Sequence, residues 1–293
     1  MLQLGRMSIF ASDNQLGTWA KERGIELAPV ADPALSHDPL LAEMNCVDDI
    51  TFFRRLGFSD VQSLDVSDWE QADLIWDLNQ PVPDGWKGRY DCVFESGTIQ
   101  HVFHLPNVLA NIHDLLKTGG RVVHGQAPSH NHVDHGFYMF SPTLFWDYWT
   151  TNGYSIDAAY WFEFEPFWFR SKFVAPPWRI RRYTPGSLDA YGYGGFGHRQ
   201  VSLFFVATRG EEATRGEVPQ QSYYERFWSD EASERMDGAA QKERSRGGSG
   251  VVRFESTLRR GMLRARLWYA WKKLRNWVVR RLPRRLPPVD LRY

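Results

Sequence analysis

Apolar runs of strand length alternate with polar turns between residues 48 and 154. Residues around Ile50, Phe53 and Leu56 predict a helix that ends at Gly57. Short apolar runs bounded by turn signals are typical of buried strands in a parallel sheet. Three such runs follow the helix, each closing near an acidic residue: Val61–Val66, Leu74–Leu78 and Tyr90–Phe94.

The next segment has helical spacing. Pro106 suits a first helical position, Lys117 lies in the expected last turn, and Gly119 with Gly120 can end the helix. One face of this helix collects the apolar residues Val108, Leu109, Ile112, Leu115 and Leu116.

The alternation continues toward residue 208. We expect a strand at Arg121–His124, a helix over Ser141–Thr151 capped by Ser141, and two further strands at Ser155–Phe164 and Gln200–Thr208. Strands alternating with helices predict an α/β fold with a doubly wound, mostly parallel, Rossmann-like sheet. We assign this domain to residues 1–208.

Composition narrows the class of protein. Aromatic residues make up 15% of the chain, which favours a folded protein over a disordered one. Two cysteines, Cys46 and Cys92, cannot form a disulfide framework or a four-cysteine zinc site, so we expect a reducing, cytoplasmic location. The sequence predicts neither a signal peptide nor a membrane-spanning segment.

The net charge of zero hides an asymmetry. Residues 253–293 carry 13 Lys/Arg against 2 Asp/Glu, a balance of +11, so the remaining residues carry −11. An acidic body argues against nucleic acid as a partner. The basic residues surround an apolar stripe up to Pro283, which predicts an amphipathic helix for an anionic membrane surface. Docking on the acidic body, or on a partner helix, is the alternative.

Ligands of open parallel sheets bind outside the carboxyl ends of the strands. The residues expected at those ends are Asp65, Asp77 and the Glu95-Ser96-Gly97 segment. An acid after the second strand commonly binds a ribose diol, so we expect a bound nucleoside there. Strand-end acids also cap helices and form turns, and each of these residues has that alternative.

The order of these pieces, from Phe52 to Val123, resembles the core of a class I S-adenosylmethionine-dependent methyltransferase. The matching features are acids after the second and third strands, a Gly/Ser segment with a hydrophobic-His pair after the fourth, and a helix ending Lys-x-Gly-Gly before the fifth. The segment His135–Phe145 is similar to one found in a bacterial subgroup of that family. The strand at 200–208 would then be the family's antiparallel seventh strand.

The resemblance implies S-adenosylmethionine as cofactor and a site for each of its parts. Asp65 would bind the ribose, and Asp77, Leu78 and Asn79 the adenine side. The methionine side would contact Gly5, Glu95, Ser96 and Gly97.

The first strand departs from the family pattern. The family has an acid there, followed by a Gly-x-Gly-x-Gly turn that lets the backbone approach the cofactor. Here Gln3 stands in place of the acid and Gly5 is the one glycine that remains. The long separation between Gly5 and Asp65 predicts an enlarged segment after the first strand.

Histidines offer candidate bases. Four histidines and an aspartate gather within His124–His135, but their spacing matches no closed metal site, so we expect a polar loop and no metal. His101 and His135 should lie near the mouth of the site, where histidine can take a proton near neutral pH. Helix capping or core packing is the alternative for His101.

Two segments flank the predicted domain core. The insertion Glu165–Gly197 alternates rings with cations, and is either a lid over a sugar or anionic acceptor or a structural hairpin. Residues 209–252 turn polar and predict a linker, and residues 253–293 form the basic tail.

The favoured hypothesis is methyl transfer from S-adenosylmethionine to a small-molecule or glycan-type acceptor, with His101 or His135 removing the acceptor proton. A methyltransferase-like binding or scaffold protein without turnover, tethered by its tail to a membrane or a partner, is the alternative, favoured by the reduced first motif. A nicotinamide-dependent Rossmann enzyme is disfavoured because no Gly-x-Gly-x-x-Gly follows a predicted strand.

Overall fold

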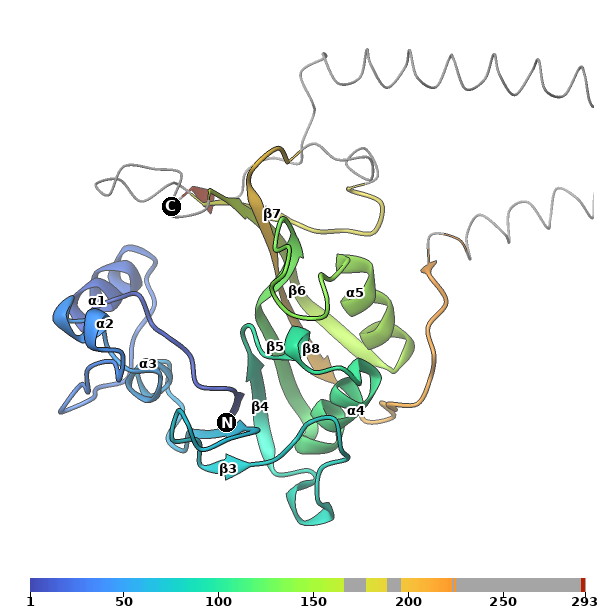
Figure 1. Cartoon of the computed structure of the whole chain (residues 1–293), viewed down its shortest axis with the longest axis horizontal. Helices are drawn as coiled ribbons and strands as arrows, with labels where there is room; N and C mark the ends of the chain where they lie inside the picture. The colour runs from blue at the N-terminus through green and yellow to red at the C-terminus, as the bar shows by residue number, and fades with distance from the viewer. Residues whose placement is uncertain (166–177, 189–195, 223, 225–290, 293) are drawn as a thin grey trace, which may run out of the picture.

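The protein is built around one mixed sheet (Figure 1). The computed structural model describes residues 1–165, 178–188, 196–222, 224 and 291–292. Within these ranges nine strands follow the order β3-β2-β1-β4-β5-β8-β6-β7-β9. The pairs from β3 to β5 are parallel, and β8 lies between β5 and β6, antiparallel to both. The α/β sheet with an antiparallel late strand is therefore confirmed.

Most of the expected strands and helices are present, while α1, α2, β7 and β9 were not predicted. The strands are β1 (Leu2–Leu4), β2 (Gln62–Asp65), β3 (Leu74–Ile75), β4 (Tyr90–Glu95), β5 (Leu116–His130), β6 (Tyr154–Phe164), β7 (Arg179–Arg182), β8 (Gln200–Arg209) and β9 (Leu291–Arg292). The helices are α1 (Asp13–Glu22), α2 (Pro39–Glu43), α3 (Asp49–Arg55), α4 (Leu105–Leu115) and α5 (Pro142–Thr151), with 3₁₀ turns at Asp84–Trp86 and Ile99–His101.

Three elements differ from the sequence expectation. Helix α4 ends at Leu115, and the buried Leu116 already pairs with Tyr90 of β4. Lys117 therefore lies in the strand, where it forms an ion pair with Asp91 at 2.8 Å and does not end the helix. Strand β5 is also much longer than expected, because β8 pairs with it out to His130. Strand β3 has two residues, since the chain turns at Asp77.

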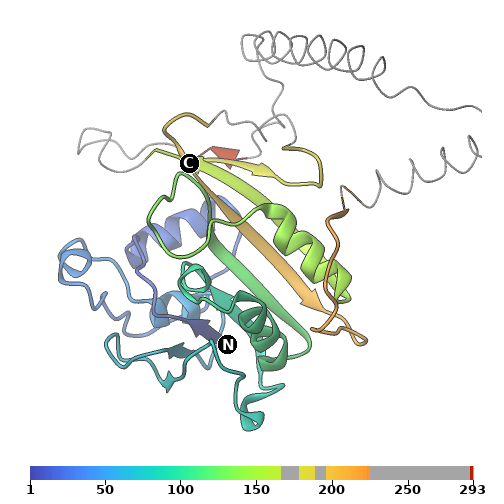
Figure 2. The same cartoon turned by 45° about the vertical axis from the view of Figure 1, so that its right-hand side comes forward.

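Helices cover both sides of the sheet. Helices α4 and α5 lie on one side and α1, α2 and α3 on the other (Figures 1 and 2). The main core joins parallel strands to α4 and α5 through Leu2, Leu64, Val93, Val122, Val108, Ile112, Phe145 and Trp149. On the opposite face, Phe53 of α3 packs against Phe94 of β4, with ring centroids 5.0 Å apart.

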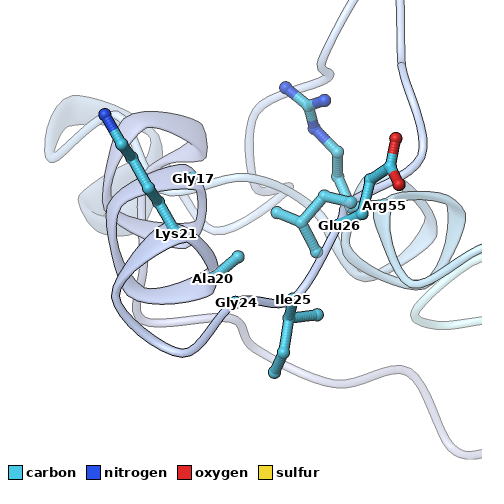
Figure 3. A pocket seen from close by; sticks show the side chains of 8 residues that line it. Gly17, Ala20, Lys21, Gly24, Ile25, Glu26 and Arg55 are labelled. Atoms are coloured by element: carbon cyan, nitrogen blue, oxygen red, sulfur yellow. The ribbon is translucent and has the colours of Figure 1, made fainter.

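The enlarged segment between β1 and β2 holds α1, α2 and α3. Arg55 at the end of α3 pairs with Asp13 at the start of α1, and isolated bridges join Ser12 to Cys46 and Leu35 to Val47. A cavity of about 400 Å³ opens beside α1, lined by that helix, the turn after it and Arg55 (Figure 3). None of its lining residues is a predicted site residue.

The first residues of the polar segment after β8 are bonded to the ends of α5 and α4. The Asn152 side chain accepts hydrogen bonds from the Thr214 hydroxyl and the Glu217 amide at 3.0 and 3.1 Å, and Arg215 pairs with Asp114. Of the predicted linker and basic tail, residues 223, 225–290 and 293 lie outside the described residues. Among the described helices, none is both long and apolar enough to cross a bilayer.

Candidate functional site

The carboxyl ends of three parallel strands meet at one edge of the sheet. Leu4 of β1 pairs with Leu64 of β2 on one side and with Glu95 of β4 on the other. The Gly5 amide then donates to the Leu64 carbonyl at 2.8 Å. Gly5, Asp65 and Glu95, which lie far apart in the sequence, are therefore neighbours, as predicted for strand-end residues.

Gly5 occupies a position that only glycine fits well. Its φ of +72° is left-handed, and a Cβ built on it would lie 2.5 Å from the Thr98 hydroxyl oxygen and 3.7 Å from Oδ2 of Asp65. Thr98 donates from that hydroxyl to the Leu4 carbonyl at 2.6 Å. Thr98 was missed by the sequence analysis, although it directly follows the Glu95–Gly97 segment that was singled out.

Asp65 presents one free carboxylate oxygen at this edge. Oδ1 accepts from the backbone amides of Val66 at 2.6 Å and Ser67 at 3.3 Å, and so forms the turn after β2. Oδ2 accepts no hydrogen bond from the described residues and faces Gly5. Asp65 can therefore form the turn with one carboxylate oxygen and bind a ligand with the other, although the sequence analysis treated these roles as alternatives.

The Asp77–Asn79 segment is held by α4 and the loop before it. Oδ1 of Asp77 accepts from both the backbone and the side-chain nitrogen of Asn79, at 2.9 and 2.8 Å. Oδ1 of Asn79 accepts from the His104 amide at 3.0 Å. Leu78 is buried, and its carbonyl accepts from the Asn107 amide group at 2.9 Å. This turn is therefore rigid before any ligand arrives.

Glu95 points into the core beneath the strand end. One carboxylate oxygen lies 2.8 Å from Nδ1 of His124, and the other is buried with no hydrogen-bond partner among the described residues. Nε2 of His124 accepts from the Trp149 indole at 3.1 Å. An indole nitrogen can only donate, so Nε2 carries no proton and the proton of a neutral His124 is on Nδ1, facing Glu95.

The loop after β4 is shaped by glycine and a glutamine. Gly97 has a φ of +100°, and its carbonyl accepts from the Gln100 side-chain amide at 2.7 Å. Ser96 lies close to Gly125 of β5, since a Cβ built on Gly125 would be 3.2 Å from the Ser96 hydroxyl oxygen. The Gln100 carbonyl in turn accepts from the Phe137 amide at 2.7 Å, which ties the histidine loop to this site.

The structure brings the two candidate bases together. The rings of His101 and His135 are both exposed and lie 5.1 Å apart between centroids. Partial burial, and then the charge of His135, lower the pKa of His101 below its usual value. The lowered pKa favours the unprotonated ring of His101, the form that a general base requires.

Of the other histidines in the cluster, His132 lies near His135, with ring centroids 6.2 Å apart, whereas His124 lies apart from them. His124 is buried in the core, while His132 lies 3.3 Å from the Ser202 hydroxyl with its pKa lowered by burial and by His135. The described residues contain no group of three or more His, Cys, Asp or Glu side chains with metal-binding geometry.

A carboxylate that the sequence analysis missed lies near the end of β1. Asp49, at the start of α3, accepts from Gln3 at 2.8 Å and from both ends of the Arg6 guanidinium at 2.6 Å. Burial alone would raise the pKa of Asp49, but the bonds and charge of Arg6 outweigh it and the pKa is lowered. Gln3, in place of the family's acid, thus binds an acid from another element.

The insertion is described in part. Residues 166–177 and 189–195 lie outside the described ranges, while β7 and the residues before β8 are placed. Arg179 and Arg181 of β7 and Arg199 all approach Glu163 of β6. These residues extend the sheet beyond the edge where Asp65 lies.

The comparisons with known proteins give similarity in structure alone. No family model and no curated protein sequence matches the chain. A methyltransferase of Thermotoga maritima, described as S-adenosylmethionine-dependent and a possible histamine N-methyltransferase, is 12% identical over 71% of this chain and 81% of its own, with a TM-score of 0.33. A methyltransferase of Mesorhizobium loti is 13% identical over 71% and 89%, with a TM-score of 0.28.

A third solved structure, the methyltransferase CalH in complex with S-adenosylhomocysteine, is 14% identical over 71% of this chain and 51% of its own, with a TM-score of 0.34. The fold assignment stands on the topology described above: parallel β3-β2-β1-β4-β5 followed by the antiparallel β8. This topology is the Rossmann-like α/β arrangement expected from the sequence.

Proposed function

We propose that the protein transfers a methyl group from S-adenosylmethionine to a small-molecule or glycan-type acceptor. The observation that carries the proposal is Oδ2 of Asp65, which accepts no hydrogen bond from the described residues and lies at the carboxyl end of β2, beside the Gly5 turn of β1. A carboxylate oxygen in that place can accept from a ribose hydroxyl while its partner oxygen keeps the turn.

The strand-end residues fit the remaining parts of the cofactor. The rigid Asp77–Asn79 turn would flank the adenine, next to the exposed Val66 and Trp69, which are 66% and 88% exposed. Gly5, Glu95, Ser96 and Gly97 would border the methionine end. When bound, S-adenosylmethionine supplies an electrophilic methyl group, and the protein's contribution is to hold donor and acceptor in line.

His101 and His135 would handle the acceptor proton. Both rings are exposed, and the lowered pKa of His101 keeps one ring able to accept a proton. An acceptor hydroxyl or amine placed against His101 would lose its proton as the methyl group arrives.

Calorimetric titration with S-adenosylhomocysteine tests the cofactor assignment. Asp65→Ala should weaken binding by about 1.5–3 kcal/mol, the usual scale for hydrogen bonds to a charged group. Asp68→Ala, which removes an exposed carboxylate three residues further on, should bind like the wild type. Absence of binding by the intact protein, or unchanged binding by Asp65→Ala at preserved stability, contradicts the proposal. Binding without turnover on any acceptor favours the scaffold alternative.

The basic tail bears on where in the cell the protein acts. We infer that the +11 balance of residues 253–293 holds the protein peripherally at an anionic membrane surface from the cytoplasmic side. The support is the sequence of the tail, which surrounds Leu and Trp with Arg and Lys.

A further inference from the structure

A cluster of three arginines around one glutamate lies at the far end of the sheet. Arg181 donates to Glu163 at 2.6 Å, Arg199 lies 3.0 Å from its second carboxylate oxygen, and Arg179 lies 3.8 Å from the first. Guanidinium groups keep their charge at neutral pH. With Glu163 ionised, the four side chains carry a net charge of +2.

The cluster is built into the sheet. Arg179 pairs with Glu163, and Arg181 pairs with Trp161, so these residues of β6 and β7 share one face of the sheet. The side chains of Glu163 and Arg181 are 2% and 5% exposed, and the Arg181 guanidinium lies 5.1 Å from the Trp161 ring centre. These contacts fix the guanidinium in place, and the one carboxylate balances only one of the three positive charges.

The cluster leaves donors unused. Nε of Arg181 is buried and has no hydrogen-bond partner among the described residues. The side chains of Arg179 and Arg199 are 47% and 28% exposed, so the cluster opens to solvent on one side. A buried donor that has no partner among the described residues, next to an excess of positive charge, is the complement of an oxyanion.

The position of the cluster relates it to the strand-end site. His124 pairs with Glu95, and β5 continues six residues further to His130, which is in register with Val201 and so with Glu163. Six residues of strand span about 20 Å. The cluster therefore lies beyond the carboxyl ends of the parallel strands, at the edge of the sheet where the cofactor is proposed to bind.

We propose that Arg179, Arg181 and Arg199 bind a dianionic, phosphate-type group at this end of the sheet. The net charge of +2 matches a phosphate monoester or diphosphate better than a single carboxylate. The anion site is independent of the proposed function. If that function also holds, the anion is one end of an elongated acceptor whose other end reaches the strand-end site.

The test uses the full chain and inorganic phosphate at constant ionic strength, with binding followed by calorimetry and thermal shift. Phosphate should raise the melting temperature more than acetate does. Arg179→Gln should weaken phosphate binding about tenfold or more, the usual effect of losing a charge-assisted bond. The matched control is Arg182→Gln on the same strand and the opposite face, which should leave phosphate binding unchanged.

Glu163→Gln separates an anion site from a purely structural ion pair. The variant should be less stable than the wild type without phosphate, and phosphate should stabilise it more than the wild type, because the anion replaces the lost charge. No stabilisation of either protein by phosphate, equal stabilisation by acetate, or equal weakening by the Arg179 and Arg182 variants would overturn the proposal. Titration of the same variants with S-adenosylhomocysteine tests the methyltransferase function separately.

Discussion

The hydroxyl of Thr98 donates a 2.6 Å hydrogen bond to the carbonyl of Leu4, 94 residues away in the sequence. The bond ties the loop after β4 to the end of β1 directly over Gly5. The single glycine left in the first motif therefore serves two needs, a left-handed backbone and room for Thr98.

Gly5→Ala should destabilise the protein more than Gly88→Ala. Both glycines have positive φ, +72° and +63°, so both substitutions carry a left-handed strain of about 1–2 kcal/mol. Only at Gly5 does the new Cβ meet an atom, the Thr98 hydroxyl at 2.5 Å. Moving that hydroxyl sacrifices its hydrogen bond, so we expect a further loss of about 1 kcal/mol in urea unfolding.

A Thr98→Ala background provides the control. Without the hydroxyl, Gly5→Ala should cost about as much as Gly88→Ala does. If Gly5→Ala and Gly88→Ala cost the same with Thr98 intact, the loop adjusts freely and the contact does not constrain the turn.

His101 should titrate below the usual histidine range. Burial and the charge of His135 lower its pKa, and His135→Gln removes the second cause, so the pKa of His101 should rise in that variant. NMR titration of the ring protons measures this without an acceptor. A pKa of His101 that does not move would show that the two rings do not interact.

The same pair sets the expected pH dependence of turnover. A base is active when unprotonated, so kcat/KM should fall as pH drops through the lowered pKa, and His135→Gln should move that limb to higher pH. His101→Gln should lose roughly 10²–10⁴ in rate with the fold intact. His104→Gln, in the same loop, is the matched control. Normal turnover in both His101 and His135 variants would place proton removal elsewhere.

The sequence predicted most of the sheet because its strands carry local signals. Short apolar runs closing on acids located β2 and β4, and helical spacing with Pro106 located α4. The neighbouring positions of Gly5, Asp65 and Glu95 followed from the general rule that parallel strands end at one edge.

The parts of the fold and of the site that the sequence did not predict depend on pairing between distant segments. Lys117 and Gly119 locally predict a helix end, but Leu116 belongs to β5 because it pairs with Tyr90 of β4. The partners of Glu95 are a histidine 29 residues away on β5 and, through it, Trp149 on α5. The spacing of residues in the sequence does not predict such contacts. The arginine cluster likewise depends on the register between β6 and β7, which brings Arg179 and Arg181 onto the face of Glu163, whereas the sequence showed only alternating rings and cations.

His113 should make stability depend on pH. Burial, and then the charge of Arg209, lower its pKa to about 4, and its ring lies 2.9 Å from the Tyr154 hydroxyl. The unfolded chain binds the proton more tightly, so stability is full above the ordinary pKa of about 6.5 and is lost as pH falls toward 4. The loss should be on the order of 2–3 kcal/mol.

Chemical unfolding of His113→Gln between pH 7 and 4 checks this dependence. Its free energy of unfolding should change less over that window than the wild-type value does. The control His37→Gln, which removes an exposed histidine, should follow the wild type. Parallel curves for His113→Gln and the wild type would contradict the assignment.

The basic tail should bind anionic lipid. Each basic residue near an anionic surface contributes about 1 kcal/mol, and burial of Trp271 and the leucines adds to it. The whole protein should therefore co-sediment with anionic liposomes and not with neutral ones. Binding should weaken as salt rises, because the Debye length shortens to about 3 Å at 1 M.

Neutralising the tail is a sharper test than deleting it, because residues Leu291 and Arg292 form β9 against β7. A full-length variant with glutamine at Arg264, Arg266, Lys272, Lys273 and Arg275 keeps that pairing and removes five positive charges. It should no longer sediment with anionic liposomes. If it sediments as well as the wild type, the tail is not the anchor. If neither protein binds and the variant melts at a lower temperature, the tail docks on the acidic body through those same charges, and the membrane proposal is wrong.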